Sequence, residues 1–449
     1  MGKATLSRLS LSAALLAMAA AAPACALGDS GQAQTTQDVA RKQAPREKFM
    51  YIVAINRGGT ADPDSLNLVG TDPEDRETYG KIFNRVDLPN VGDEVHHFAY
   101  SINNDRLLIP GLFSGRMHVF DLKKPRRPTL TTVGDTTTGG YIVPHSVIPM
   151  HDGTALVTMI GSATPTSGPG GIIRVDDQTG NFVSYFGPGP NRTASDLGEK
   201  TMYDFDIKAD INRGVSTTFG LPANVGGGIS PGGLGDEVSI WDIAREKVIQ
   251  TVNLGTNSGA LESRFIDLPG STYGYTNTPG TGAVWLWEDE DHDGFFAFHK
   301  VLEAAPGNGL ALPIDMVLSS DYHYMYLTNW FGDNVQQYDI TDRYHPVLLA
   351  QATIPHANMI RLSVDGKRLY VTNELLSTWD DDAHFGPARN TNYGLWAFDV
   401  DTDHGGLSSF TADGSAWVKF DHVQKKTSVG PAGPHMMLFD PKASPLGEH

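Results

Sequence analysis

The chain has 449 residues, of which 40% are hydrophobic and 19% charged, and it contains 49 glycines and 27 prolines. This composition is typical of a turn-rich, all-β globular protein and disfavours a helical or disordered chain. The net charge of −18 argues against binding to nucleic acid or to anionic membrane surfaces, because phosphate groups require a footprint of lysine and arginine.

The first 26 residues have the features of a secretory signal peptide. Lys3 and Arg8 precede the apolar run "LSLSAALLAMAAAAPACA", which ends in small residues suited to cleavage after Ala24 or Ala26. We therefore expect a periplasmic or secreted protein. The run is too short for a membrane span, and no later run approaches the ~20 apolar residues that a transmembrane helix needs.

Cys25 is the only cysteine. It offers an alternative to simple cleavage, in which the thiol carries a lipid anchor. Whether Cys25 is removed or lipidated, the folded domain keeps no thiol, which excludes disulfides, zinc–thiolate sites and iron–sulfur clusters together. Any transition metal must then be held by imidazole, carboxylate or thioether groups. Residues 27–47 are polar and aperiodic and predict a flexible linker.

From residue 48 to the end of the chain, one pattern recurs. A short apolar strand and a turn are followed by a strand that ends in an acidic residue, at intervals of 46 to 66 residues. Seven units of four short strands are the sequence mark of a β-propeller. We therefore predict an all-β fold, a single seven-bladed β-propeller over residues 48–449. The acidic markers are Asp72, Asp121, Asp176, Asp242, Glu288, Asp339 and Asp399.

Histidines occur where the inner strands of several blades are expected to begin. His97 and His145 each precede a turn by seven residues, and His435 opens a similar strand that is expected to close the ring. The first strand of a propeller blade lies nearest the axis, so these three imidazoles should meet at one end of the central channel. His96 either turns inward through a bulge or supports a ligand by a hydrogen bond.

Taken singly, each of these histidines is readily explained as a buried structural residue bridged by water. Taken together, His96, His97, His145 and His435 predict a metal site. Ligation by nitrogen alone suits copper, and less well iron, better than calcium or magnesium.

Two aspartates, Asp204 in "YDFDI" and Asp315 in "PIDM", open the inner strands of other blades. Facing a metal, their carboxylates would orient ligand imidazoles or act as a general base toward bound water, which makes them candidate catalytic residues. The alternative is a structural role in ion pairs, of the kind that Glu262 and Arg264 are placed to form.

The segment "DEDHDG", residues 289–294, places oxygen ligands at alternate positions before a glycine, as calcium loops do. A structural calcium at Asp289, Asp291 and Asp293 is one interpretation. The twelfth position of the loop is Lys300 instead of the bidentate glutamate of an EF-hand, so a solvated acidic hairpin is the other interpretation.

Several segments together resemble the selenium-binding protein family, which includes the copper-dependent bacterial methanethiol oxidases. They include "GDEVHHFAY", "VPHSVIP", "LSVDGKRLYVTNELLSTWD", "DVDTDHGGL" and "GPAGPH", and the resemblance extends from about Met50 to Asp440. It implies a seven-bladed propeller with copper bound by the four histidines named above. It also implies a periplasmic enzyme that converts methanethiol, dioxygen and water to formaldehyde, hydrogen sulfide and hydrogen peroxide.

The chain departs from the family pattern close to the expected site. Gly80 stands at the position of the family's selenium-binding cysteine, so selenium binding through that thiol is not expected. Gly332 replaces a family histidine, and Met436 follows the last histidine where the family often has an acidic residue. These changes put the substrate, more than the metal, in question.

Three functions follow as alternatives. The first is a copper-dependent oxidase of small sulfur compounds, whose partners are a small thiol and dioxygen. The second is a non-catalytic propeller of this family that carries copper or serves as an interaction scaffold. The third is an iron oxygenase of the carotenoid-cleaving type, whose four histidines are spaced less like those found here.

Overall fold

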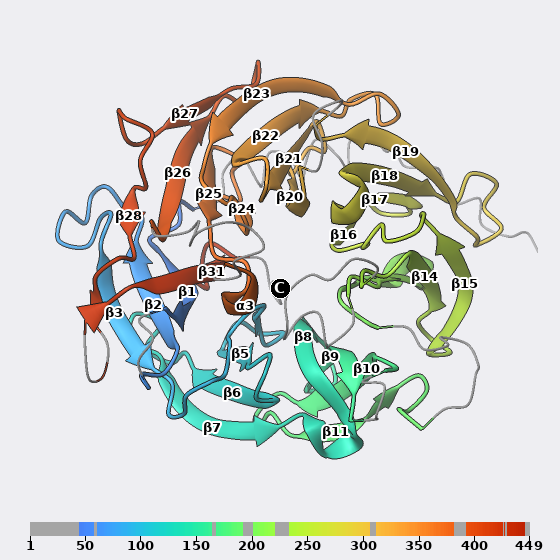
Figure 1. Ribbon diagram of the computed structural model, residues 1–449, viewed down its shortest axis with the longest axis horizontal. Coiled ribbons are helices and arrows are strands. Elements are labelled where there is room, and N and C mark those ends of the chain that lie inside the picture. Colours follow the sequence, from blue (N-terminus) through green and yellow to red (C-terminus); the bar gives the residue numbers. More distant parts are fainter. Residues whose placement is uncertain are drawn as a thin grey trace, which may run out of the picture.

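Seven antiparallel sheets surround a central axis in the computed structural model, which confirms the predicted seven-bladed β-propeller (Figure 1). The structure describes residues 45–57, 61–163, 168–191, 201–220, 233–305, 311–380, 392–424, 426 and 429–444. The predicted signal peptide, Cys25 and most of the predicted linker lie outside the described residues, and they stay predictions. In the part of the chain that is described, no helix is long and apolar enough to cross a bilayer.

Six blades are built from strands that follow one another in the chain, from the inner strand to the outer one (Figure 1). An additional strand, β28 (Val418–Lys419), pairs with β26 in the last of them. The six blades comprise β4 (Ala99–Tyr100), β5 (Arg106–Pro110), β6 (Arg116–Asp121) and β7 (Thr129–Asp135); β8 (Tyr141–Pro149), β9 (Thr154–Ser162), β10 (Gly171–Asp176) and β11 (Phe182–Phe186); β12 (Phe205–Lys208), β13 (Arg213–Thr217), β14 (Glu237–Asp242) and β15 (Lys247–Asn253); β16 (Ser263–Phe265), β17 (Tyr273–Thr278), β18 (Ala283–Glu288) and β19 (Ala297–Glu303); β20 (Pro313–Leu318), β21 (Tyr324–Asn329), β22 (Asn334–Asp339) and β23 (Val347–Thr353); β24 (Ile360–Leu362), β25 (Arg368–Thr372), β26 (Gly394–Val400) and β27 (Leu407–Ser409).

The seventh blade closes the ring with strands from both ends of the described chain. A hydrogen bond from the Lys48 amide to Asp440 Oδ2, 2.7 Å long, ties these ends together. The prediction that the strand of His435 closes the ring is therefore confirmed. From the axis outward, the blade consists of β31 (Ala432–Phe439), β1 (Phe49–Asn56), β2 (Ser65–Gly70) and β3 (Ile82–Asp87).

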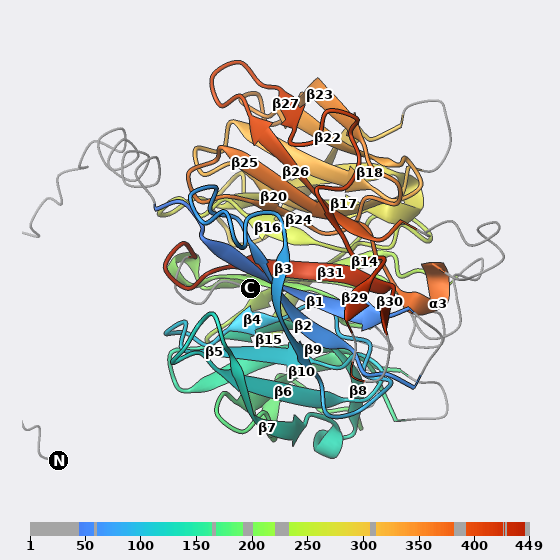
Figure 2. The ribbon, with the colours of Figure 1, turned by 90° about the vertical axis from the view of Figure 1, so that its left-hand side faces the viewer.

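The remaining elements are short. The helix α3 (Ser377–Asp380) lies at one face of the ring and close to its axis (Figures 1 and 2). The others are the strand pair β29 (Val423–Gln424) and β30 (Val429–Gly430) and the 3-10 turns η1 (Thr137–Gly139), η2 (Ala209–Ile211) and η3 (Pro279–Thr281).

Burial follows the position of a strand in its blade. β1, β2 and β9 are almost wholly buried and mostly apolar, because neighbouring blades cover both of their faces. The outer strand β7 alternates exposed and half-buried residues, which is the two-residue period of a strand with one face toward solvent.

Threonine and asparagine side chains on second strands hold neighbouring blades together near the axis. The Thr158 hydroxyl on β9 donates to the Tyr203 carbonyl of the next blade at 2.6 Å and accepts a hydrogen bond from the Ser146 amide at 2.9 Å. Such bonds satisfy buried backbone groups that the inner strands leave unpaired. The corresponding contacts run from Thr217 to Leu261, from Asn277 to Pro313, from Thr328 to Asn358 and from Thr372 to His435.

Candidate metal centre

Four imidazoles meet at the axis of the propeller. The ring centroids of His96 and His435 are 3.8 Å apart, those of His97 and His145 are 4.1 Å apart, and every ring has at least two of the others within 6.5 Å. All four residues are buried, with at most 6% of their surface exposed. The structure thus brings together the predicted metal ligands from opposite ends of the chain.

β-Bulges aim two of these rings. β8 and β31 each place two consecutive residues opposite a single partner residue, His145 with Ser146 in β8 and His435 with Met436 in β31. A bulge re-aims side chains that a regular strand would direct elsewhere. His145 accordingly borders a small apolar cavity, whereas Ser146 and Met436 line a larger polar pocket.

His96 and His97 precede β4, and both rings belong to the cluster. Between Val95 and Ala99 the inner segment has one more residue than the strand with which it pairs, which is the count of a bulge. His96 borders the small cavity and His97 lines the larger pocket. Of the two alternatives drawn from the sequence, the structure therefore shows the one in which a bulge turns both rings inward.

Two of the four rings are held in the tautomer that metal ligands use. His145 Nδ1 lies 3.2 Å from the Tyr203 carbonyl oxygen and His435 Nδ1 lies 2.7 Å from the Glu374 carbonyl oxygen. Each Nδ1 therefore carries the proton, and Nε2 keeps its lone pair. Among the described residues, the Nε2 atoms of all four histidines are buried without a hydrogen-bond partner. Neutral imidazole nitrogens suit a transition metal. Among the described residues at the axis, the ligand atoms that all lie within 4.8 Å of one another belong to His96, His435 and Glu374, and His97 and His145 lie further out.

Burial lowers the pKa of all four imidazoles. The pKa of His145 falls to about 3 and that of His435 to about 4. The pKa values of His96 and His97 fall well below their usual range, through burial first and then through the neighbouring rings. The rings are therefore neutral near pH 7, and their unshared lone pairs are costly to bury unless something binds them.

An apolar cluster closes one side of the four histidines. Leu112, Phe219 and Trp379 help to line a cavity of about 20 Å³, which has room for about one water molecule. The Glu94 carboxylate holds α3 over this side by accepting hydrogen bonds from the Ser377 amide and hydroxyl, each 2.6 Å long. Burial, and then nearby carboxylates, raise the pKa of Glu94 to about 8.

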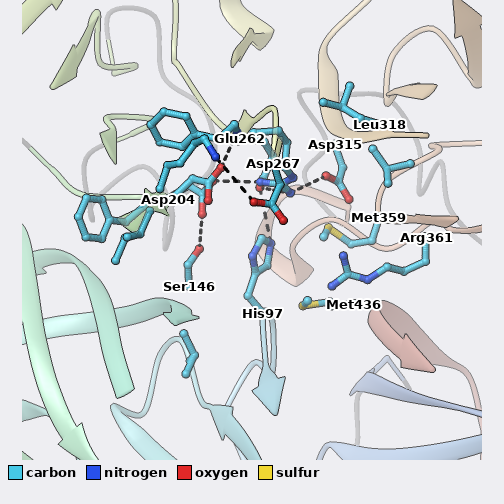
Figure 3. Close-up of a pocket in the computed structure, with 18 of the residues that line it drawn as sticks. His97, Ser146, Asp204, Glu262, Asp267, Asp315, Leu318, Met359, Arg361 and Met436 are labelled. Carbon is cyan, nitrogen blue, oxygen red and sulfur yellow. Dashed lines mark hydrogen bonds and ion pairs between the residues drawn. The ribbon is translucent and has the colours of Figure 1, made fainter. Parts of the chain in front are cut away.

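A polar pocket of about 450 Å³ lies on the other side of the histidines (Figure 3). At its centre, the Arg264 guanidinium lies 2.8 Å from Glu262 Oε2, 3.2 Å from Asp204 Oδ2 and 3.3 Å from Asp315 Oδ1. One positive charge among three carboxylates gives this group a negative balance. His97 lines the same pocket, and its Nε2 lies 3.8 Å from Glu262 Oε1.

The structure places both candidate catalytic aspartates in this pocket, and hydrogen bonds hold both of them in place. Asp204 accepts bonds from the Ser146 hydroxyl and the Ser263 amide, each 3.0 Å long. Asp315 accepts bonds of 2.7 and 3.1 Å from two backbone amides. Glu262 is the carboxylate of this pocket that lies within 4 Å of an imidazole. Burial, and then the Asp204 charge, raise the pKa of Glu262 well above its usual range.

Residues 29–440 match the family described as 56kDa selenium binding protein (SBP56). The chain belongs to this family. It is 28% identical over 413 residues to the methanethiol oxidase of Danio rerio (81% of this chain, 88% of the relative). It is 27% identical over 443 residues to that of Homo sapiens (85% and 91%). It is also 27% identical over 437 residues to selenium-binding protein 2 of Arabidopsis thaliana (82% and 87%).

A comparison with solved structures also finds a selenium-binding protein. A hypothetical selenium-binding protein from Sulfolobus tokodaii superposes with a TM-score of 0.75 at 26% identity, and the match covers 89% of this chain and 95% of that one. The periplasmic gluconolactonase of Pseudomonas aeruginosa, with a TM-score of 0.60 at 13% identity, shares the fold alone. The resemblance read from the sequence motifs is therefore confirmed at the level of the family.

Two glycines at which this SBP56 member departs from the family pattern have local structural reasons. Gly80 lies between β2 and β3 with φ of 67°, and an added Cβ would come within 3.1 Å of the Trp417 indole, so glycine is favoured there. At Gly332, between β21 and β22, an added Cβ would lie 2.8 Å from Asn329 Cβ. Neither glycine lines the two cavities beside the histidines, whereas Met436 lines the polar pocket.

Sequence reasoning missed Glu374. One oxygen of this carboxylate lies 3.3 Å from His435 Nδ1, and Glu374, His435 and His96 offer ligand atoms that all lie within 4.8 Å of one another. The only signal in the sequence was an acidic residue directly after the strand segment "RLYVTN". Its partner lies 61 residues further along the chain, so no local spacing links the two.

Proposed function

We propose that this protein is a periplasmic or secreted copper-dependent oxidase of small thiols such as methanethiol. The overall reaction converts methanethiol, dioxygen and water to formaldehyde, hydrogen sulfide and hydrogen peroxide, in which the carbon loses two electrons and dioxygen gains two. The observation that carries the proposal is the set of four buried imidazoles whose Nε2 atoms have no hydrogen-bond partner within the described part of the chain. Relatives named methanethiol oxidase support the choice of reaction.

In this proposal, His96, His97, His145 and His435 hold copper, and His145 and His435 do so through Nε2. Copper bound there would lower the pKa of a thiol ligand and supply the redox couple that links the thiol with dioxygen. The carbonyl groups that face His145 Nδ1 and His435 Nδ1 keep these rings oriented with Nε2 toward the centre.

The polar pocket is the proposed entrance for the thiol, because His97 lines it (Figure 3). Glu262 Oε1, 3.8 Å from His97 Nε2, would accept the thiol proton, and its raised pKa makes it a stronger base than an ordinary carboxylate. Arg264 holds Glu262 in place, and Asp204 and Asp315 hold Arg264. We therefore assign the two aspartates a positioning role in the reaction. The apolar cluster on the opposite side keeps bulk water from the centre.

The test compares copper-loaded wild-type protein with His145→Ala in a closed oxygen electrode. Wild type should consume one dioxygen per methanethiol and release sulfide and peroxide in equal amounts. His145→Ala should lose this turnover and bind less copper in elemental analysis. His323→Ala is the matched control, because that side chain is 59% exposed. Wild type that binds one copper per chain and consumes no dioxygen would rule out the oxidase.

The alternative function is a copper carrier without turnover. It is favoured by the thioethers of Met359 and Met436, which line the pocket beside His97 (Figure 3), because methionine sulfur suits Cu(I). Copper that passes from the loaded protein to a strong Cu(I) chelator, with no thiol oxidised, would identify this function.

A further inference from the structure

Three carboxylates converge in the loop between β18 and β19, which belong to the outer half of their blade (Figure 1). Asp289, Asp291 and Asp293 each place one carboxylate oxygen within 4.8 Å of the other two. Like charges at this separation repel one another unless a cation lies between them. None of these three residues belongs to the polar pocket or to the small cavity beside the histidines.

The charged side chains around this loop are paired with other groups. Glu290 pairs with His299 at 2.8 Å, and Lys300 pairs with Glu303 at 2.6 Å. Arg343, between β22 and β23 of the next blade, pairs with Glu288 at 2.5 Å. Among the described residues, no cationic side chain forms an ion pair with the three aspartates. The Arg213 guanidinium lies beside the loop, where its Nε donates to the Gly294 carbonyl at 3.1 Å.

Asp289 adds an independent observation. Only 7% of its surface is exposed, and its Oδ2 accepts a hydrogen bond of 3.1 Å from the Gly294 amide. Its other oxygen, Oδ1, is buried and has no hydrogen-bond partner among the described residues. A buried carboxylate oxygen without a partner is costly, and a cation held between Asp289 and the two exposed aspartates would remove this cost.

We propose that the loop of residues 289–294 binds Ca²⁺ through Asp289, Asp291 and Asp293. Calcium takes oxygen ligands in flexible geometry and completes its shell with carbonyl groups and water, whereas Mg²⁺ needs near-octahedral geometry and gives up water reluctantly. The loop lacks a bidentate glutamate at its twelfth position, Lys300, so its affinity falls in the range of extracellular calcium modules, about 10⁻⁴ to 10⁻³ M. This site is independent of the proposed copper chemistry.

The chain contains an internal comparison with the same spacing. The segment "DVDTD", residues 399–403, also has aspartates at alternate positions. There, however, Asp401 Oδ1 accepts hydrogen bonds from the amides of Asp403 and His404, at 2.9 and 3.0 Å. All three aspartates of this segment are exposed. Sequence spacing alone therefore does not create a site, and the segment supplies a matched control.

The experiment uses Tb³⁺, which occupies Ca²⁺ sites and luminesces when nearby tryptophans are excited. Trp285 and Trp287 lie on β18, the strand that leads into the loop. The full-length protein is titrated with Tb³⁺ and then with Ca²⁺, as wild type, as Asp291→Asn with Asp293→Asn, and as Asp401→Asn with Asp403→Asn. Circular dichroism checks that both double variants, which change exposed residues only, remain folded.

We expect one saturable luminescent site in wild type that millimolar Ca²⁺ displaces, with Mg²⁺ much less effective. The change at Asp291 and Asp293 should weaken this binding at least tenfold, and the change at Asp401 and Asp403 should leave it intact. Calcium should also raise the unfolding temperature of wild type and not that of the first double variant. Wild type without Ca²⁺-displaceable luminescence, or equal binding in wild type and the first variant, overturns the proposal.

Discussion

Replacing Arg264 with methionine should destabilise the protein. Methionine keeps much of the apolar volume but removes the cation that contacts Asp204, Glu262 and Asp315 together. These three residues are 5%, 1% and 2% exposed, whereas the Arg264 side chain is 30% exposed. Removing one partner of a fully buried ion pair costs about 3–5 kcal/mol. Because water reaches Arg264, we expect a loss of about 2–4 kcal/mol in the free energy of unfolding at pH 7.

This loss should shrink in acid. Burial, and then the Asp204 charge, already raise the pKa of Glu262, and burial raises the pKa of Asp315, while Arg264 lowers both. Acids whose pKa is raised by folding stabilise the native state below their unfolded pKa, near 4, and lose that contribution as the pH rises through the folded pKa. The Arg264→Met substitution raises these pKa values further. The free energy of unfolding of the variant should therefore be close to that of wild type near pH 4 and lower than that of wild type toward pH 7.

Urea unfolding followed by tryptophan fluorescence, at pH 5 and at pH 7, measures both effects. Arg245→Met is the matched control, because that side chain is 78% exposed and pairs with Asp242 at 3.2 Å at the surface. This control should lose less than about 1 kcal/mol at either pH. Equal losses for Arg264→Met at the two pH values would refute the reasoning, because the loss would then reflect packing and not charge.

Three further changes test other parts of the structure. Glu374→Gln should weaken copper binding about 10- to 100-fold in a competition titration, because groups that contact ligand histidines contribute that much; an unchanged affinity would contradict its role beside His435. Thr158→Val should cost about 1–3 kcal/mol, because the buried Ser146 amide loses its partner and the Tyr203 carbonyl loses the shortest of its hydrogen bonds, and the exposed Thr131→Val should cost less. Asp206→Asn should flatten the decline in stability that accompanies a rise in pH from about 4 to above 6, since burial raises the pKa of Asp206 to about 6; a profile that stays the same would show that Asp206 does not titrate there.

The blades and the histidines were predictable because they depend on local repeats. Each blade repeats the same strands and turns, and His97 and His145 stand at equal distances from a turn, so their common place near the axis follows from counting. Contacts between distant segments leave no such signal. The bond between Glu94 and Ser377 joins residues 283 positions apart, and it depends on how α3 packs on the ring. The sequence pattern predicted Asp204 and Asp315 at the start of inner strands. It did not predict that both contact Arg264, because that contact joins different blades.

The strand β31 completes the seventh blade, and it also carries His435. A chain that is not yet fully folded brings together at most three of the four imidazoles, because the fourth joins them only when β31 docks against β1. If the proposed copper site is correct, full metal affinity would therefore require a closed ring. For the proposed copper, ring closure would thus have to precede loading, and this order would follow from the connectivity of the ring.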